Sequence, residues 1–124
     1  MTWQLESPEK QDKVFYQKGI DRITNLSVGA LSLGEVRFFE LILVGNLDHP
    51  LIMLDEPFAM IEPLHKEMIK QYLSNLKLTK GIIATDHYYK DVLEITDRNY
   101  IIDNGNSFEI EDINDLKSYG YIPS

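Results

Sequence analysis

Apolar residues gather in short runs along the chain, and two of these runs end in polar side chains. Residues 51–54 are all apolar and are followed at once by Asp55 and Glu56. Such a run predicts a strand buried on both faces, as in a parallel sheet covered by helices. A second short apolar run, 82–85, has the same character.

Helical spacing of apolar residues indicates four helices between and after these runs. They are expected at 35–47, 63–76, 88–95 and 113–118. The first is apolar nearly all round, which predicts burial, and the second carries an apolar stripe at every third or fourth position. His49 and His65 lie outside these patterns and are expected to face solvent.

A third apolar run, 100–102, leads into Asn104-Gly105 and an alternating stretch, 107–110. Asn-Gly accepts the positive φ angles of a tight hairpin turn, so the two stretches are expected to pair antiparallel. The resulting order is strand, helix, strand, helix, strand, hairpin strand, helix. This order predicts an α/β fold with right-handed crossovers and a parallel core.

The composition mainly excludes certain kinds of protein and site. A chain of 124 residues with 44% hydrophobic residues has room for one modest domain with a core. Its net charge of −8 argues against a nucleic-acid-binding surface, which needs clustered Lys and Arg. It has no cysteine, which excludes disulfides and thiolate sites and fits a reducing compartment. The start of the chain lacks the pattern of a signal peptide.

Acidic residues follow the first strand at the place where α/β sheets bind ligands. Parallel strands present their carboxyl ends at one edge, so Asp55 and Glu56 should meet Asp86 and His87 there. Pro57 cannot donate to a ladder and ends the strand. Carboxylates at this position hold Mg²⁺ or orient water in nucleoside triphosphatases. The alternative interpretation is a strand that runs into a solvated acidic loop.

The start of the first helix offers a second candidate group. Ser32 precedes Glu35 by three residues, the spacing of a capping box. In one interpretation this stretch only caps a helix. In the other, the helix N-terminus with Gly34 is an anion site, because its backbone amides are free to bind negative charge.

Taken in order, these pieces resemble the ATP-binding-cassette (ABC) ATPases, the nucleotide-binding subunits of ABC transporters. The resemblance covers residues 31–110. The matching segments are Leu31–Glu35 (signature motif), Leu51–Asp55 (Walker B strand), Ala59–Pro63 (D-loop) and Asp86-His87 (switch histidine). Residues 94–105 are similar to the lipopolysaccharide-export type in particular.

The resemblance implies an incomplete P-loop NTPase-like parallel sheet with flanking helices and a C-terminal β-hairpin. Residues 31–124 would form the C-terminal part of the ATPase domain, and 1–30 a connector or partial helical subdomain. Implied roles are catalysis by Glu56 and His87, nucleotide binding by Ser32, Gly34 and Glu35, and Mg²⁺ binding by Asp55. The implied cofactors are ATP and Mg²⁺. Implied partners are the missing N-terminal ATPase half, a second ATPase subunit and a transmembrane transporter subunit. The implied location is cytoplasmic and peripheral, at the inner face of the cell membrane.

Three departures from the family pattern accompany the resemblance. Leu33 stands where the signature has glycine, and Glu62 stands where the D-loop has aspartate. A P-loop needs Gly-x-x-x-x-Gly-Lys-Ser/Thr. Gly29 and Gly34 have the glycine spacing, but Glu35-Val36 follows. The sequence therefore contains no Walker A motif, resembles the C-terminal half of the family, and is expected to be inactive alone.

Two other functions compete with a partial transporter ATPase. One is a stand-alone ABC-derived interaction module without ATP turnover, and the other is an unrelated Mg²⁺-dependent hydrolase that uses Asp55 and Glu56. In the resembled fold, the P-loop strand separates the strands expected at 82–85 and 99–102. Without it, these strands are expected to pair directly, and the uncovered apolar faces predict self-association.

Overall fold

A computed structural model describes residues 28–124, so most of the predicted connector 1–30 lies outside the described residues. Contacts divide the chain into two compact units, Met1–Tyr88 and Tyr89–Ser124. The described part of the first unit begins with a short 3₁₀ turn, η1 (Val28–Ala30). Each unit has its own strand pair.

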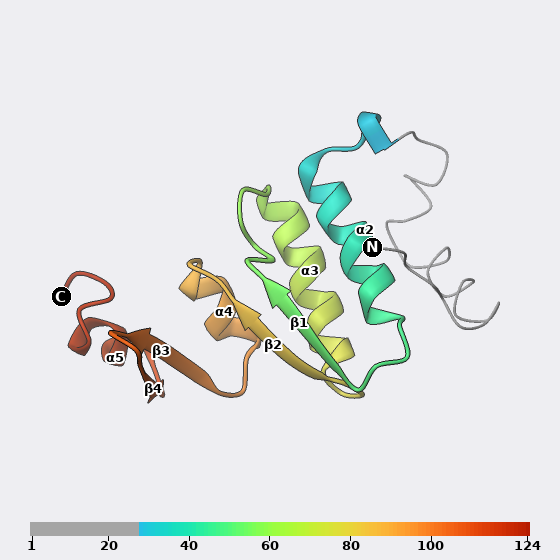
Figure 1. The fold of residues 1–124 in the computed structure, drawn as a ribbon. Helices are drawn as coiled ribbons and strands as arrows, with labels where there is room; N and C mark the ends of the chain where they lie inside the picture. The colour runs from blue at the N-terminus through green and yellow to red at the C-terminus, as the bar shows by residue number, and fades with distance from the viewer. Residues whose placement is uncertain (1–27) are drawn as a thin grey trace. The chain divides into compact units, whose positions relative to one another are not determined.

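The first unit is a parallel strand pair with two helices. In chain order it contains α2 (Leu33–Gly45), β1 (Leu51–Asp55), α3 (Pro63–Leu76) and β2 (Gly81–Thr85). β1 pairs with β2 in parallel, from Leu51 opposite Gly81 to Asp55 opposite Thr85. α2 and α3 pack side by side (Figure 1). The α/β order with a parallel core, predicted from the apolar runs, is confirmed.

Both helices of this unit begin where local chemistry requires. Ser32 caps α2, and its capping box with Glu35 is present, so α2 starts two residues before the predicted boundary and ends at Gly45. α3 follows Glu62 and has Pro63 in its first turn, where the missing N–H of proline costs no hydrogen bond.

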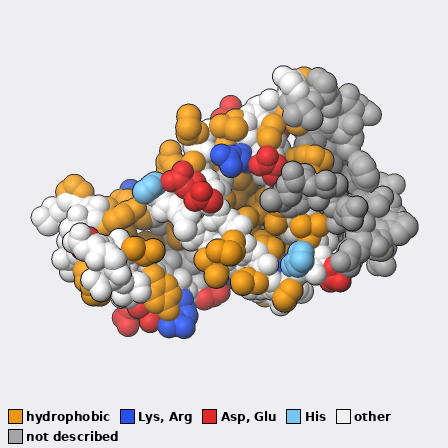
Figure 2. Space-filling model, in the orientation of Figure 1, with side chains coloured by type: hydrophobic (Ala, Val, Ile, Leu, Met, Phe, Trp, Pro, Cys, Tyr) orange, Lys and Arg blue, Asp and Glu red, His pale blue; other side chains and the backbone are white. Residues whose placement is uncertain are grey.

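β1 is buried on one face only, so the prediction of a strand buried on both faces is wrong. Ile52 is 4% exposed, whereas its neighbour Met53 is 73% exposed. Leu51 and Ile83 are also half exposed. Hydrophobic side chains accordingly lie over the region of β1 and β2 on the face seen in Figure 2. The physical reason is that α2 and α3 form a single covering layer within residues 28–88.

Two glycines let α2 approach α3 closely. A Cβ on Gly34 would lie 2.5 Å from ring atoms of His65, and a Cβ on Gly45 would lie 2.4 Å from the hydroxyl of Tyr72. Burial raises the pKa of Tyr72 to about 12 because phenolate loses its hydration there. Phe38, which is 4% exposed, makes an edge-to-face contact with the same ring.

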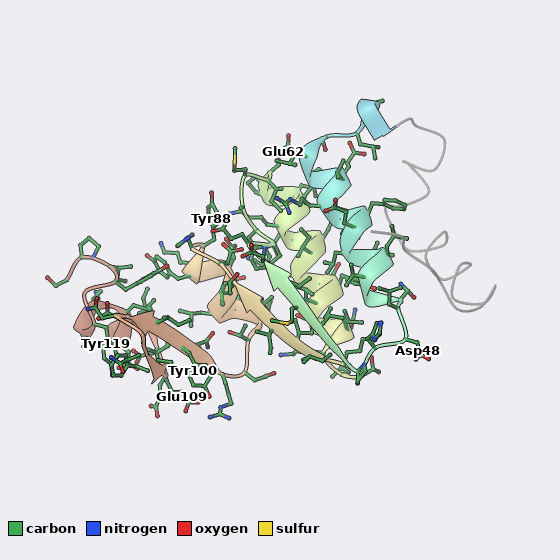
Figure 3. All side chains as sticks on the ribbon, in the orientation of Figure 1. Asp48, Glu62, Tyr88, Tyr100, Glu109 and Tyr119 are labelled. Atoms are coloured by element: carbon green, nitrogen blue, oxygen red, sulfur yellow. The ribbon has the colours of Figure 1, made fainter. Side chains whose placement is uncertain are left out.

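The second unit is a hairpin with two short helices. It contains α4 (Tyr89–Ile95), β3 (Asn99–Asp103), β4 (Asn106–Ile110) and α5 (Ile113–Ser118). Asn104 and Gly105 both have positive φ, as the predicted turn requires. Ile101, Ile110 and Leu116 form the small core of this unit. On the outer face, Tyr100 and Glu109 lie side by side (Figure 3).

Within the first unit β1 pairs with β2, and within the second unit β3 pairs with β4 in the antiparallel hairpin. The expected direct pairing of 82–85 with 99–102 would join the two units and stays a prediction.

One-sided burial of β1 gives a direct stability prediction. Ile52→Ala should lower the free energy of unfolding by about 2–5 kcal/mol, because it opens a cavity under the helices. Met53→Ala, at the next position of the same strand, should change it by less than about 0.5 kcal/mol. Urea denaturation of both variants checks this, and equal losses would contradict burial on one face.

Candidate functional site

The carboxyl edge of the β1–β2 pair brings Asp55 and Thr85 together. They are register partners, and the Thr85 hydroxyl donates a 2.7 Å hydrogen bond to Oδ1 of Asp55. Thr85 therefore fixes the direction of the Asp55 carboxylate, which remains exposed to solvent. The role of Thr85 was missed from sequence, although the expected parallel pairing contained the necessary signal.

Glu56 and His87 face each other directly beyond the strand ends. Oε1 of Glu56 lies 3.1 Å from Nε2 of His87. The backbone N–H of Glu56 donates a 2.7 Å bond to the Thr85 carbonyl, and Glu56 has φ of 49°, a conformation that non-glycine residues rarely adopt. The His87 side chain is 80% exposed, so this pair lies at the protein surface.

Asp86 joins the loops that follow β1 and β2. Its Oδ2 accepts a 2.8 Å hydrogen bond from the Phe58 N–H, and its Oδ1 accepts a 2.9 Å bond from the Tyr88 N–H. The Phe58 side chain is only 1% exposed and anchors its loop in the core. Asp86 is thus a structural clamp that holds Glu56 and His87 at one edge, as expected from the strand order.

The predicted nucleotide-binding residues form a group of their own at the start of α2. The Ser32 hydroxyl accepts a 3.2 Å bond from the Glu35 N–H, and the Glu35 carboxylate accepts a 3.4 Å bond from the Ser32 N–H. Ser32 is exposed, whereas Gly34 and Glu35 are buried. The predicted capping box is therefore confirmed, while nucleotide binding by these three residues stays a prediction.

His65 corrects the expectation of a solvated helix position. It lies in the first turn of α3, is only 7% exposed, and packs its ring on Gly34. The expected apolar stripe of α3 is shifted accordingly, because Leu64 is 64% exposed. The glycine on the facing helix leaves room for the histidine ring. The spacing of apolar residues within one helix cannot reveal such a space on another helix, so the burial of His65 was not predicted.

Asp55 is the group at this edge suited to a metal ion. Among residues 28–124, no cluster of three or more His, Asp or Glu side chains is arranged to hold a metal. Mg²⁺ commonly keeps several waters and takes one or two carboxylates together with substrate phosphates. The oriented carboxylate of Asp55 fits that mode of binding, which needs phosphate oxygens as well, and does not fit a protein-only cage.

Two further features bear on where function resides. A pocket of about 500 Å³ in the second unit is lined by residues from 93–99 and 109–113, and it contains none of the predicted site residues.

In the described part of the chain, no helix has both the length and the apolar character to cross a bilayer.

Comparison with solved structures defines the class of this fold. The chain superimposes on the ADP conformation of an ATP-binding cassette of an ABC transporter with a TM-score of 0.70. The match covers 99% of this chain and 50% of that one, at 20% sequence identity. The predicted fold class, part of an ABC ATPase with a parallel sheet and a C-terminal hairpin, is thereby confirmed.

Sequence relatives carry the comparison further. The chain is 33% identical over 98 residues to the lipopolysaccharide export system ATP-binding protein LptB of Haemophilus influenzae. It is 28% identical over 105 residues to LptB of Escherichia coli K12, and 25% identical over 107 residues to the thiamine import ATP-binding protein ThiQ of Salmonella typhimurium. No family model matches the chain.

These matches cover 78% to 85% of this chain but only 41% to 46% of the relatives. The chain thus spans less than half the length of its curated relatives, and the part it matches is C-terminal. By fold and by sequence similarity, the chain corresponds to the C-terminal half of the ATP-binding proteins of ABC transporters. The lipopolysaccharide-export type is among its relatives, as the sequence resemblance indicated.

The clamp by Asp86 can be tested without any ligand. Asp86→Ala leaves the N–H groups of Phe58 and Tyr88 without their acceptor, which should cost about 1–3 kcal/mol of stability. Hydrogen exchange at these two amides should become faster by more than the global loss of stability explains. Asp103→Ala, at an exposed position beside the hairpin turn, is the control. Unchanged exchange at both amides would contradict the clamp.

Proposed function

We propose that the chain supplies part of an ATP-binding and ATP-hydrolysing subunit of an ABC transporter. The observation that carries the proposal is the convergence of Asp55, Glu56 and His87 at one sheet edge, in a chain whose relatives are ABC ATP-binding proteins. Sequence order alone did not require the 3.1 Å approach of Glu56 to His87. The fold match supports the same class.

Each residue at the edge has a distinct proposed role. Asp55, oriented by Thr85, would hold Mg²⁺ through its water shell, and the bound ion would neutralise phosphate charge. Glu56 would accept a hydrogen bond from the attacking water and so aim it at the γ-phosphate. His87 lies beside that carboxylate and, with its exposed ring, would contact the same phosphate.

The start of α2 would serve the nucleotide from a second direction. Helix N-termini attract anions through free amides and the helix dipole. Ser32 and Glu35 cap this end, Gly34 has no side chain, and Leu33 is 46% exposed beside them. We propose that Ser32, Gly34 and Glu35 face the nucleotide of a second ATPase subunit, as the family signature does.

A phosphate cradle must come from outside this sequence. Phosphoryl transfer depends on holding the phosphates in line, and P-loop amides with their lysine do this in the class. The sequence has no such motif. We propose that the N-terminal ATPase half provides it, that a second ATPase subunit and a transmembrane subunit complete the assembly, and that the assembly works at the cytoplasmic face of the membrane.

A competing function is an ABC-derived interaction module without ATP turnover. The exposed face formed by Leu51, Met53 and Ile83 favours it, because an apolar face on a sheet invites a partner. Both functions predict that something covers this face, but only the ATPase function assigns chemistry to Glu56. The two are therefore separated by substitution of that residue.

The test joins the N-terminal half of Haemophilus influenzae LptB to this chain. In the fused protein, Glu56→Gln should lower the ATP hydrolysis rate at least about a hundredfold while ATP binding persists, because the amide keeps the shape but not the charged acceptor. Glu40→Gln, at an exposed position of α2, is the control. Phosphate release and binding of a fluorescent ATP analogue measure the two properties.

Equal hydrolysis by the fused protein and its Glu56→Gln variant would remove Glu56 from the mechanism. A folded fusion that binds ATP but does not hydrolyse it, with either residue at position 56, would favour the interaction module.

The proposed role of Asp55 can be tested separately in the same fused protein. Asp55→Asn should weaken the dependence of ATP binding on Mg²⁺, because a neutral amide is a poor partner for the water shell of a hard cation. A magnesium titration at fixed nucleotide concentration measures this. An unchanged Mg²⁺ midpoint would contradict the proposed metal role.

A further inference from the structure

His65 has a buried imidazole that the proposed mechanism leaves unexplained. It is 7% exposed, and its Nδ1 is buried without a hydrogen-bond partner. Buried polar atoms in native proteins are nearly always paired, so an unpaired one calls for a reason. The surroundings of the ring supply one.

The His65 ring packs against the start of α2. A Cβ built on Gly34 would lie 2.5 Å from both Cγ and Nδ1 of His65, far inside van der Waals contact. The ring therefore occupies the space that any side chain at position 34 would need. Gly34 is the second residue of α2, directly between the capping partners Ser32 and Glu35. A shift of the imidazole towards α2 would therefore press on this backbone.

The same ring also approaches Glu62, which directly precedes α3 and is labelled in Figure 3. Oε2 of Glu62 lies 3.8 Å from Nδ1 of His65, and the Glu62 side chain makes no capping bond to α3. Glu62 ends the loop that starts at Glu56, and Met60 in this loop also has positive φ. The imidazole thus approaches both the loop that follows β1 and the start of α2.

We propose that His65 is a positioning residue that couples the loop 56–62 to the start of α2. Its ring sets the position of the Gly34 backbone, and its Nδ1 responds to the Glu62 carboxylate. The consequence for nucleotide binding rests on the proposed function of the α2 start. A change in the loop that carries Glu56 is thereby transmitted to Ser32, Gly34 and Glu35.

The other end of the same helix interface provides a matched comparison. There Gly45 packs on Tyr72, whose hydroxyl accepts a 3.3 Å hydrogen bond from the Asn46 side chain. That contact has the same geometry and a satisfied polar group, and it lies about three turns of α2 away from the capping box. The Gly45–Tyr72 contact therefore serves as a control for helix packing without the proposed coupling.

A double-mutant cycle on the full chain tests the steric part. Gly34→Ala should lower the folding equilibrium constant at least about tenfold when His65 is present. In the His65→Ala background the same substitution should change it less than about threefold, because the added methyl then has room. Gly29→Ala, where nothing lies within 4 Å of the new Cβ, is the neutral control. Additive effects of the two substitutions would overturn the proposal.

Nuclear magnetic resonance of the full chain tests the coupling itself. Glu62→Gln changes an exposed side chain and should shift the Gly34 and Glu35 amide signals but not the Gly45 signal. In a His65→Phe background, which keeps a ring but removes Nδ1, that response should be lost. In a His65→Asn background, which keeps a polar atom near the Nδ1 position, it should return.

No shift at Gly34 on Glu62→Gln, or the same shift with His65→Phe, would overturn the coupling. Neither measurement uses nucleotide, so their outcome is independent of the proposed function. In the fusion with the LptB half, His65→Phe should raise the KM for ATP at least about threefold with a smaller change in kcat. If the full chain shows the coupling but the fusion keeps an unchanged KM, the coupling stands. Only the proposed nucleotide role of the α2 start is then contradicted.

Discussion

The parallel pairing of β1 with β2 is the constraint on which the candidate site depends. Register places Asp55 opposite Thr85, and the residues that follow each strand emerge at the same edge. The Thr85 carbonyl accepts from Glu56, and Asp86 clamps both loops. A slip of one residue in this ladder would turn Asp55 to the other face and break these contacts together.

Much of this architecture could be predicted because its causes are local. The Asn104-Gly105 turn, the Ser32–Glu35 capping box and Pro63 in the first turn of α3 each fix a boundary through nearest neighbours. Apolar runs located the strands for the same reason. The edge that collects Asp55 and Glu56 also followed from sequence, since parallel strands share an edge whatever their side chains.

The features that could not be predicted from sequence depend on packing between residues far apart in the chain. His65 is buried because Gly34 on another helix leaves space for its ring, which no periodicity within α3 reports. Met53 is exposed because, within residues 28–88, helices cover only one face of β1. The strand itself is apolar enough to be buried on both faces. Asp86 was noted as a neighbour of His87, but its hydrogen bond to Phe58 spans 28 residues.

We propose that this chain carries catalytic groups whose phosphate cradle is supplied by an N-terminal ATPase half. The most direct measurement is phosphate release by the chain, by the N-terminal half of LptB, and by the two joined in one polypeptide. The account predicts background release by each part alone and Mg²⁺-dependent release by the joined protein. Release by the isolated chain that Glu56→Gln abolishes would contradict it.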